Sequence, residues 1–179
     1  MTAGAGIRQT TLVLGGARSG KSRYAEELVE SGGRGLYLAT AAHNPADPEM
    51  VDRIARHRQR RGDLWITIEE PLEIPDILLS HGQADRPILV DCLTLWLSNL
   101  MFAGRDIGLA TADLLAALDA TDGPVVLVSN EVGLGIVPDT ALARTFRDHA
   151  GRLHQAVAAA CDRVVFMAAG LPLMMKDEN

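Results

Sequence analysis

The chain has 179 residues, a length that suits one domain with its own core, and 47% of them are hydrophobic, which excludes global disorder. Its net charge of −6 at pH 7 argues against nucleic-acid binding, which requires a basic face. Two cysteines without metal-ligand or disulfide spacing and a start without a signal-peptide pattern predict a cytoplasmic protein. No apolar run approaches the length of a membrane span.

A glycine-rich stretch follows the first predicted strand, at residues 10–14. It reads Gly15, Gly16, Ala17, Arg18, Ser19, Gly20, Lys21 and Ser22, which matches the G-x-x-x-x-G-K-[ST] pattern of a phosphate-binding P-loop. Its glycines let backbone N–H groups converge on a phosphate, and the helix predicted at 20–31 directs its positive end to the same place. Lys21 supplies a positive charge and Ser22 offers a hydroxyl to Mg²⁺. The stretch predicts binding of a nucleoside triphosphate such as ATP or GTP.

An arginine-rich helix is predicted at about 48–61, after a short strand at 36–40 and a polar loop. His57 lies four residues after Arg53 and three before Arg60, so the three side chains share one helix face. Nearby positive charge lowers the pKa of a histidine and keeps its imidazole neutral, as a nucleophile requires. A solvated basic face with an incidental histidine is the alternative, and the residues alone leave both open.

A second candidate for phosphate chemistry is an aspartate at the end of a buried strand. After a strand at 65–69 and a helix at about 71–80, the strand at 88–91 ends in Asp91. In P-loop proteins a carboxylate at this place helps to hold Mg²⁺ near the P-loop hydroxyl. The next residue is Cys92 rather than a second acid that would activate water, which disfavours a motor ATPase.

The rest of the chain continues the alternation of helices and strands. We expect a strongly apolar helix at 93–102, either buried or at an interface, and helices at 110–120 and about 139–161. Strands are predicted at 124–130 and 163–168, with a further short one at 171–175, and the glycine-containing loop at 131–138 suits ligand binding at the end of its strand. This order predicts an α/β fold in one domain, residues 1–179, with a mostly parallel sheet and helices on both faces.

Several functions are compatible with these residues. They are a small-molecule kinase, a nucleotidyltransferase that works through a covalent histidine, and a non-catalytic nucleotide-binding module. A GTPase switch is disfavoured, because the chain lacks an Asn-Lys-x-Asp motif and an Asp-x-x-Gly after Asp91.

Three stretches together resemble one family. The P-loop at 15–22, the segment at 53–57 and the Asn-Glu-Val-Gly-Leu-Gly-Ile-Val-Pro run at 130–138 are similar to the bifunctional adenosylcobinamide kinase / adenosylcobinamide-phosphate guanylyltransferases of cobalamin biosynthesis. The resemblance extends from residue 12 to about 176. It implies a RecA-like P-loop NTPase fold and two reactions, phosphorylation of adenosylcobinamide and transfer of GMP from GTP to the product.

The resemblance also implies roles for individual residues. GMP would be carried by His57, while Lys21 and Mg²⁺ stabilise the departing pyrophosphate. Some relatives have a second histidine just before this one, where this chain has Arg56. Further nucleotide contacts are implied at Ala39, Thr40, Ala41, Arg58, Gln59, Arg60, Glu69 and Asp91. Glu69 would bind guanine or ribose. The implied partners are adenosylcobinamide and two further copies of the chain in a homotrimer, which the apolar 93–102 segment could join. A monofunctional P-loop kinase is the second hypothesis.

Overall fold

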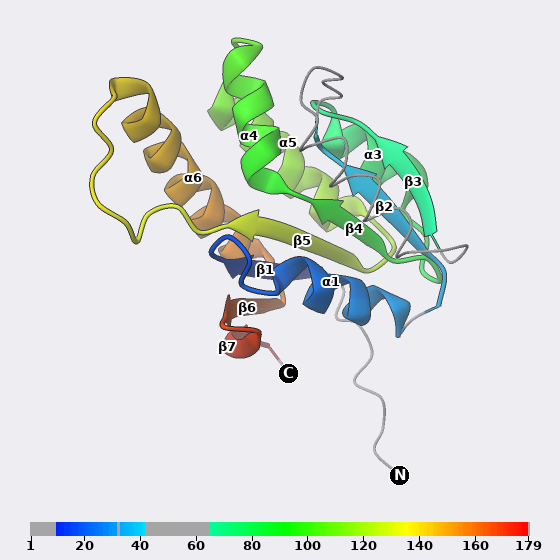
Figure 1. Ribbon diagram of the computed structural model, residues 1–179. Helices are drawn as coiled ribbons and strands as arrows, with labels where there is room; N and C mark the ends of the chain where they lie inside the picture. The colour runs from blue at the N-terminus through cyan, green and yellow to red at the C-terminus, as the bar shows by residue number, and fades with distance from the viewer. Residues whose placement is uncertain (1–9, 32, 42–64, 179) are drawn as a thin grey trace.

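A computed structural model describes residues 10–31, 33–41 and 65–178. Its strands form one seven-stranded sheet in the order β3-β2-β4-β5-β1-β6-β7, shown in Figure 1. The strands are β1 (Thr10–Gly15), β2 (Gly35–Ala39), β3 (Trp65–Glu69), β4 (Ile88–Asp91), β5 (Val125–Asn130), β6 (Arg163–Ala168) and β7 (Leu171–Asp177). The helices are α1 (Lys21–Glu30), α3 (Ile74–His81), α4 (Leu93–Phe102), α5 (Ile107–Ala120) and α6 (Ala141–Ala160).

Among the seven described strands, neighbours are parallel from β3 through to β6, and β7 alone runs antiparallel to its neighbour. The central strands are continuous runs of β-branched and leucine side chains that are buried on both faces, as expected for parallel strands covered by helices. The predicted α/β fold with a mostly parallel sheet is therefore confirmed. Because parallel strands share a direction, their carboxyl ends lie along one edge.

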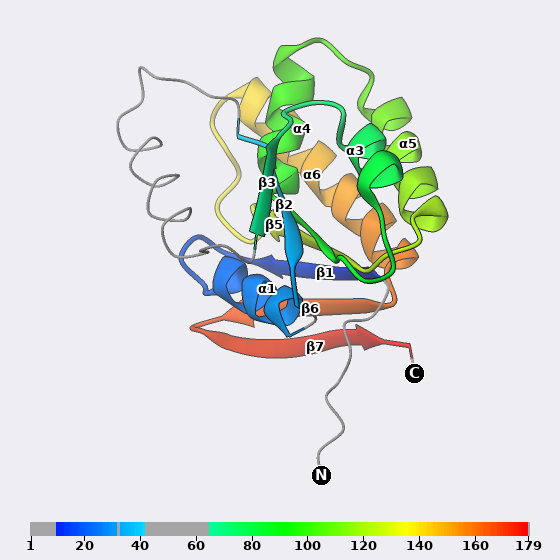
Figure 2. The same ribbon diagram turned by 90° about the vertical axis from the view of Figure 1, so that its right-hand side faces the viewer.

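Two apolar layers pack against the sheet, one on each face. In β1, Leu12 and Leu14 join the layer under α3, α4, α5 and α6, whereas Val13 joins Ala25 and Val29 of α1 on the opposite face. This division follows from the alternation of side chains along a strand. Figures 1 and 2 show α1 on one side of the sheet and the other four helices on the other. The prediction of helices on both faces is confirmed for the described residues.

Helix ends differ from the predicted ones where side chains bond to the backbone. α3 begins later than predicted, because the Glu70 carboxylate accepts hydrogen bonds from the amides of Leu72 and Glu73 and holds a turn there. α5 begins earlier than predicted, since the Asp106 side chain caps it by accepting from the Leu109 amide. Both are cases of local side-chain bonding that sets a helix start.

The apolar 93–102 segment is confirmed as helix α4, and its apolar side chains belong to the core rather than to an open face. Leu93, Trp96, Leu97 and Leu100 are at most 2% exposed, and the indole N–H of Trp96 donates to the carbonyl of Leu72. Phe102, at its end, is exposed. Of the two predicted roles, the structure shows burial, and a role of this segment in an assembly stays a prediction.

Residues 42–64 lie outside the described part of the chain. The helix predicted at 48–61, with His57, Arg58, Gln59 and Arg60, falls in this range and stays a prediction. On either side of this range, residue 41 follows the end of β2 and residue 65 begins β3. These two strands are parallel neighbours in the sheet.

Candidate active site

The P-loop joins the end of β1 to the start of α1, as the sequence predicts. Arg18 and Gly20 have positive φ angles of 57° and 96°, and the left-handed conformation at Gly20 is one that side-chain-bearing residues rarely adopt. The amide of Ser19 donates to the carbonyl of Gly16, and that of Tyr24 donates to Gly20. The loop thus turns tightly and delivers the first amides of α1 at the sheet edge.

Lys21 lies in the first turn of α1 with its side chain over the loop. It is only 8% exposed, and its ammonium donates to the Gly16 carbonyl over 3.0 Å. Buried charges need such partners. The bond places a positive charge at the mouth of the loop, where the phosphate chain of a nucleotide binds in P-loop proteins.

The loop also packs closely on the turn between β6 and β7. A Cβ at Gly15 would come within 2.6 Å of the Met167 carbonyl oxygen and of Ser19 Oγ, and one at Gly20 within 3.3 Å of Gly170 Cα. The Gly170 amide donates to the Ser19 carbonyl over 2.9 Å. Glycine is required at Gly15 for this close approach, and the β6–β7 turn supports the back of the P-loop.

Asp91 ends β4 at the same edge of the sheet. The hydroxyl of Tyr37, from β2, donates to its carboxylate over 2.5 Å, and this contact fixes one carboxylate oxygen. Ser22 follows Lys21 on α1, and α1 packs against β1, β4 and β5. A hydroxyl and a carboxylate placed on neighbouring elements are the few protein ligands that Mg²⁺ needs beside phosphate oxygens and water.

Thr40, which is predicted to contact the nucleotide, connects the ends of two strands through its side chain. It is fully buried; its hydroxyl donates to the Cys92 carbonyl and accepts from the Cys92 amide, each over 2.8 Å. Its own carbonyl accepts from the Asn99 side chain. The Cys92 thiol contacts the Thr94 hydroxyl instead, and its pKa is raised by burial and by the nearby Asp91 carboxylate. The Thr40 side chain is therefore engaged in the scaffold, and the flanking Ala39 and Ala41 are partly exposed.

The sheet register brings other predicted residues together. Ala39 of β2 pairs with Glu69 on one side and with Asp91 on the other, so three predicted nucleotide contacts form a row. Glu69 is exposed at the end of β3. The row lies on one side of β5 and β1, next to the P-loop.

Two polar residues at the end of β5, Asn130 and Glu131, lie beside the P-loop, and the sequence alone did not assign either of them a role. Asn130 pairs in register with Gly15, and its amide donates to the Thr94 hydroxyl over 3.1 Å. The following residue, Glu131, donates its backbone N–H to the Gly15 carbonyl. The loop at 131–138 is predicted from sequence to bind a ligand, but only the pairing of β5 with β1 shows that it borders the P-loop.

Glu131 lies beside a buried histidine of α6. Its Oε2 is 3.9 Å from His154 Nδ1, and His154 Nε2 is 2.7 Å from Ser129 Oγ. Burial lowers the pKa of His154 and the Glu131 carboxylate raises it, with burial the larger effect. His154 is therefore neutral at neutral pH, and Glu131 faces an uncharged ring.

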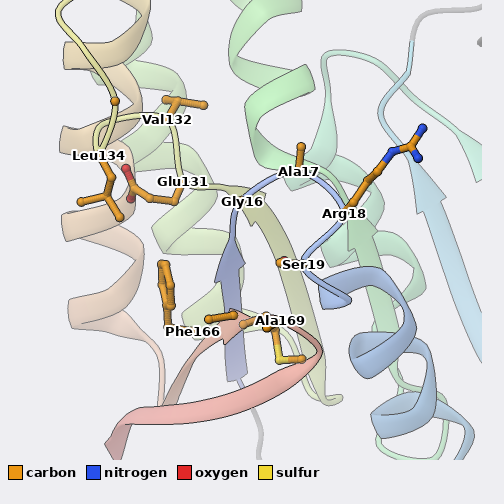
Figure 3. Close-up of a pocket in the computed structure, with 12 residues that line it drawn as sticks. Gly16, Ala17, Arg18, Ser19, Glu131, Val132, Leu134, Phe166 and Ala169 are labelled. Carbon is orange, nitrogen blue, oxygen red and sulfur yellow. The ribbon is translucent and has the colours of Figure 1, made fainter.

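A pocket of about 550 Å³ opens between the P-loop, the loop after β5 and the end of β6. Its polar lining includes Ser19 and Glu131, and Ser19 Oγ is buried with no hydrogen-bond partner in the described chain. Figure 3 shows Glu131, Leu134 and Phe166 gathered on one side of the P-loop, with Arg18 pointing away from them. The pocket is mainly apolar, with a carboxylate at its wall.

Between residues 10 and 178, outside the undescribed stretches, no cluster of three or more His, Cys, Asp or Glu side chains is arranged to hold a metal ion by itself. The helices of the described chain include none with the length and apolar character to cross a bilayer.

Comparison with known families decides how this site is interpreted. The family model described as cobinamide kinase / cobinamide phosphate guanyltransferase matches residues 11–175. The chain belongs to this family. It is 51% identical over 170 residues to the bifunctional adenosylcobalamin biosynthesis protein CobP of Pseudomonas aeruginosa, covering 93% of this chain and 97% of that protein. It is 39% identical over 180 residues to the bifunctional adenosylcobalamin biosynthesis proteins CobU of Escherichia coli and of Salmonella typhimurium. Each of these two matches covers 92% of this chain and 98% of the CobU protein.

Solved structures outside the cobinamide kinase family share the fold. The chain matches a type III secretion system ATPase with a TM-score of 0.55 and 12% identity, covering 94% of this chain and 59% of that one. It matches the P4 protein of bacteriophage phi6 in complex with ADP with a TM-score of 0.52 and 18% identity, covering 94% of this chain and 55% of that one. The chain thus spans less than two thirds of these longer proteins. They establish the RecA-like P-loop NTPase fold.

Proposed function

We propose that the protein phosphorylates the hydroxyl of adenosylcobinamide with ATP or GTP, and then transfers GMP from GTP to the new phosphate to give adenosylcobinamide-GDP and pyrophosphate. The observation that carries this proposal is the P-loop at the end of β1, in a chain whose family match covers residues 11–175. Both reactions break a phosphoanhydride bond of a nucleoside triphosphate, so one phosphate-binding loop serves both.

The P-loop, residues 15–22, would hold the phosphate chain. Backbone amides of such a loop bind phosphate oxygens, and Lys21 would supply charge near the phosphates. The buried Ser19 hydroxyl, which has no partner among the described residues, would gain a hydrogen bond from a bound phosphate oxygen. In the guanylyl transfer the same groups stabilise the departing pyrophosphate.

The donor set of Ser22 and Asp91 fits Mg²⁺, a cation that takes oxygen ligands and uses few protein side chains beside phosphates. A bound Mg²⁺ would neutralise the negative charge that develops on the phosphate oxygens. Tyr37 orients the Asp91 carboxylate by donating to one of its oxygens, and the other oxygen would bind the cation.

The remainder of the nucleotide would extend along the ends of β4, β2 and β3. Ala39 and Ala41 line this side, with Thr40 acting through the scaffold it braces, and Glu69 would accept the N–H groups of guanine or a ribose hydroxyl. Arg58, Gln59 and Arg60 are proposed as further contacts on the strength of the sequence.

We assign the covalent step to His57. Its imidazole nitrogen attacks the α-phosphorus of GTP, a P–N bond forms, and the bond to the bridging oxygen breaks with release of pyrophosphate. A phosphate oxygen of adenosylcobinamide phosphate then attacks the same phosphorus and breaks the P–N bond. Two displacements through a nucleophile are ordinary covalent catalysis.

The assembly is proposed to be a homotrimer of single-domain chains in the cytoplasm, where nucleoside triphosphates are available. The surface that supports assembly is β7 at the sheet edge, rather than α4. Leu171, Leu173, Met174 and Met175 are between 44% and 72% exposed on this edge strand, and exposed apolar edges favour contact with another chain.

The test is an assay of purified protein with Mg²⁺, adenosylcobinamide and either ATP or GTP. Mass spectrometry should find adenosylcobinamide phosphate with at least one of the two donors, ATP or GTP. It should find adenosylcobinamide-GDP only when GTP is present. Phosphate product without the GDP product would support the monofunctional kinase. Nucleotide binding without any product would indicate a non-catalytic module.

A further inference from the structure

The P-loop has two sides, and the proposed nucleotide contacts occupy only one. Ala39, Glu69 and Asp91 are at the ends of β2, β3 and β4, whereas the 550 Å³ pocket is lined by the P-loop, the loop after β5 and the end of β6. In the sheet order, the row of nucleotide contacts lies at the ends of β3, β2 and β4, and the pocket lies at the ends of β5, β1 and β6. A nucleotide whose base extends toward β3 therefore leaves the pocket open to the second substrate.

One carboxylate is built into the wall of this pocket. The Glu131 backbone is tied to the Gly15 carbonyl over 3.0 Å, which fixes it beside the start of the P-loop. Its Oε1 accepts a hydrogen bond from the Gly133 amide, and its Oε2 is 3.9 Å from the neutral ring of His154. The side chain is 22% exposed. The Gly133 amide thus anchors one carboxylate oxygen, and the other oxygen faces the uncharged ring of His154.

The rim of the pocket is strongly apolar. Of the residues that line the pocket, Val132 is 36% exposed and Leu134 82%, and the same loop continues with Ile136, 97% exposed, and Val137, 61% exposed. Figure 3 shows Leu134 and Phe166 on the same side of the P-loop as the carboxylate. Soluble proteins seldom expose several large apolar side chains in one short loop without a ligand or partner for them. A bulky acceptor with apolar flanks and one reactive hydroxyl matches this combination.

We propose that the pocket binds the acceptor end of cobinamide and that Glu131 is the general base of the kinase step, with loop 132–137 contacting the body of the corrinoid. This rests on the proposed function. The acceptor hydroxyl oxygen attacks the γ-phosphorus, a new P–O bond forms, and the bond from that phosphorus to the β–γ bridging oxygen breaks. The hydroxyl proton passes to Glu131, and the electron pair of the broken bond leaves with the nucleoside diphosphate.

A second role for Glu131, which lines the pocket together with Phe166, would be to bind the guanine base of GTP. The geometry of its carboxylate disfavours this role. A carboxylate that reads guanine accepts two N–H groups with its two oxygens. Here the Gly133 amide already occupies Oε1. A single available oxygen suits one hydroxyl.

The test compares E131Q with the wild-type protein in the kinase reaction. The side-chain oxygen of glutamine can still accept the hydrogen bond from the Gly133 amide, but glutamine cannot take the proton of the acceptor hydroxyl. The kcat should therefore fall by about 100-fold or more, with little change in the KM for nucleotide. E27Q, on the exposed face of α1 where Glu27 pairs with Arg23, is the matched control and should keep the wild-type kcat. A kcat for E131Q within threefold of wild type would overturn the assignment.

A second variant tests the pocket without touching the carboxylate. Because Leu134 is largely exposed, L134D should fold, and it should raise the KM for cobinamide about tenfold or more while leaving the nucleotide KM unchanged. A rise in the nucleotide KM instead would assign the pocket to the base and overturn the proposal. If the wild-type protein itself fails to phosphorylate cobinamide, the proposed function fails first. Normal wild-type turnover with unaffected variants would refute this inference alone.

Discussion

Thr40→Val removes one hydroxyl from the contact between the ends of β2 and β4. In the wild-type protein the fully buried Thr40 hydroxyl makes two hydrogen bonds of 2.8 Å to the backbone of Cys92. The Cys92 carbonyl also accepts from the Trp96 amide, so it keeps a partner in the variant. The Cys92 amide loses the partner that the described structure gives it. A buried unpaired amide costs about 1–3 kcal/mol and a lost hydrogen bond about 1 kcal/mol, so we expect a total loss of about 2–4 kcal/mol.

Thr40→Ser is the matched control, because it keeps the hydroxyl and removes one methyl group. Its cost should be about 1 kcal/mol. Urea unfolding followed by circular dichroism measures both free energies of unfolding, and nucleotide affinity is measured by calorimetry. Equal stability of the two variants would refute the reasoning from the hydroxyl. Loss of nucleotide affinity in Thr40→Val at unchanged stability would show that Thr40 contacts the nucleotide directly.

Three further changes test the P-loop, the buried histidine and the assembly surface. Gly15→Ala places a Cβ 2.6 Å from the Met167 carbonyl oxygen, so calorimetry should find nucleotide affinity reduced about tenfold or more, a loss of at least about 1.4 kcal/mol; Gly151→Ala, whose Cβ meets nothing within 4 Å, should bind normally. The pKa of His154 is lowered from 6.5 in the fold, so the unfolded chain binds more protons below that pH and stability should decrease as the pH falls from 7 to 5. Thermal unfolding of His154→Gln should show a weaker pH dependence, and an equal dependence would contradict the buried neutral histidine. Leu173→Lys on β7 should reduce the mass measured by light scattering from that of the proposed trimer to that of a monomer, whereas Phe102→Lys, also at an exposed apolar residue, should keep the wild-type mass.

The sequence carried enough local information for most of the fold. The P-loop pattern, the alternation of elements and the strand ending in Asp91 place the phosphate site at the carboxyl edge of a parallel sheet, and the register then brings Ala39, Glu69 and Asp91 into one row. These inferences succeed because strand direction and glycine-dependent turns are set by nearby residues.

Contacts between distant residues were harder to predict. The Tyr37–Asp91 hydrogen bond joins residues 54 positions apart, and the approach of Glu131 to His154 depends on how α6 packs against the sheet. The antiparallel β7 did leave a local signal. Ala169 and Gly170 both have positive φ angles, and a two-residue connection containing glycine is typical of a hairpin.

The most direct test of the account uses GTP labelled at the α-phosphate, with Mg²⁺ and no corrinoid. The protein should acquire label that remains after denaturation, is stable in base and is released by acid, as expected for GMP on a histidine nitrogen. His57→Ala should acquire none while still binding GTP. Label in that variant, or none in the wild-type protein with nucleotide binding intact, would contradict guanylyl transfer through His57.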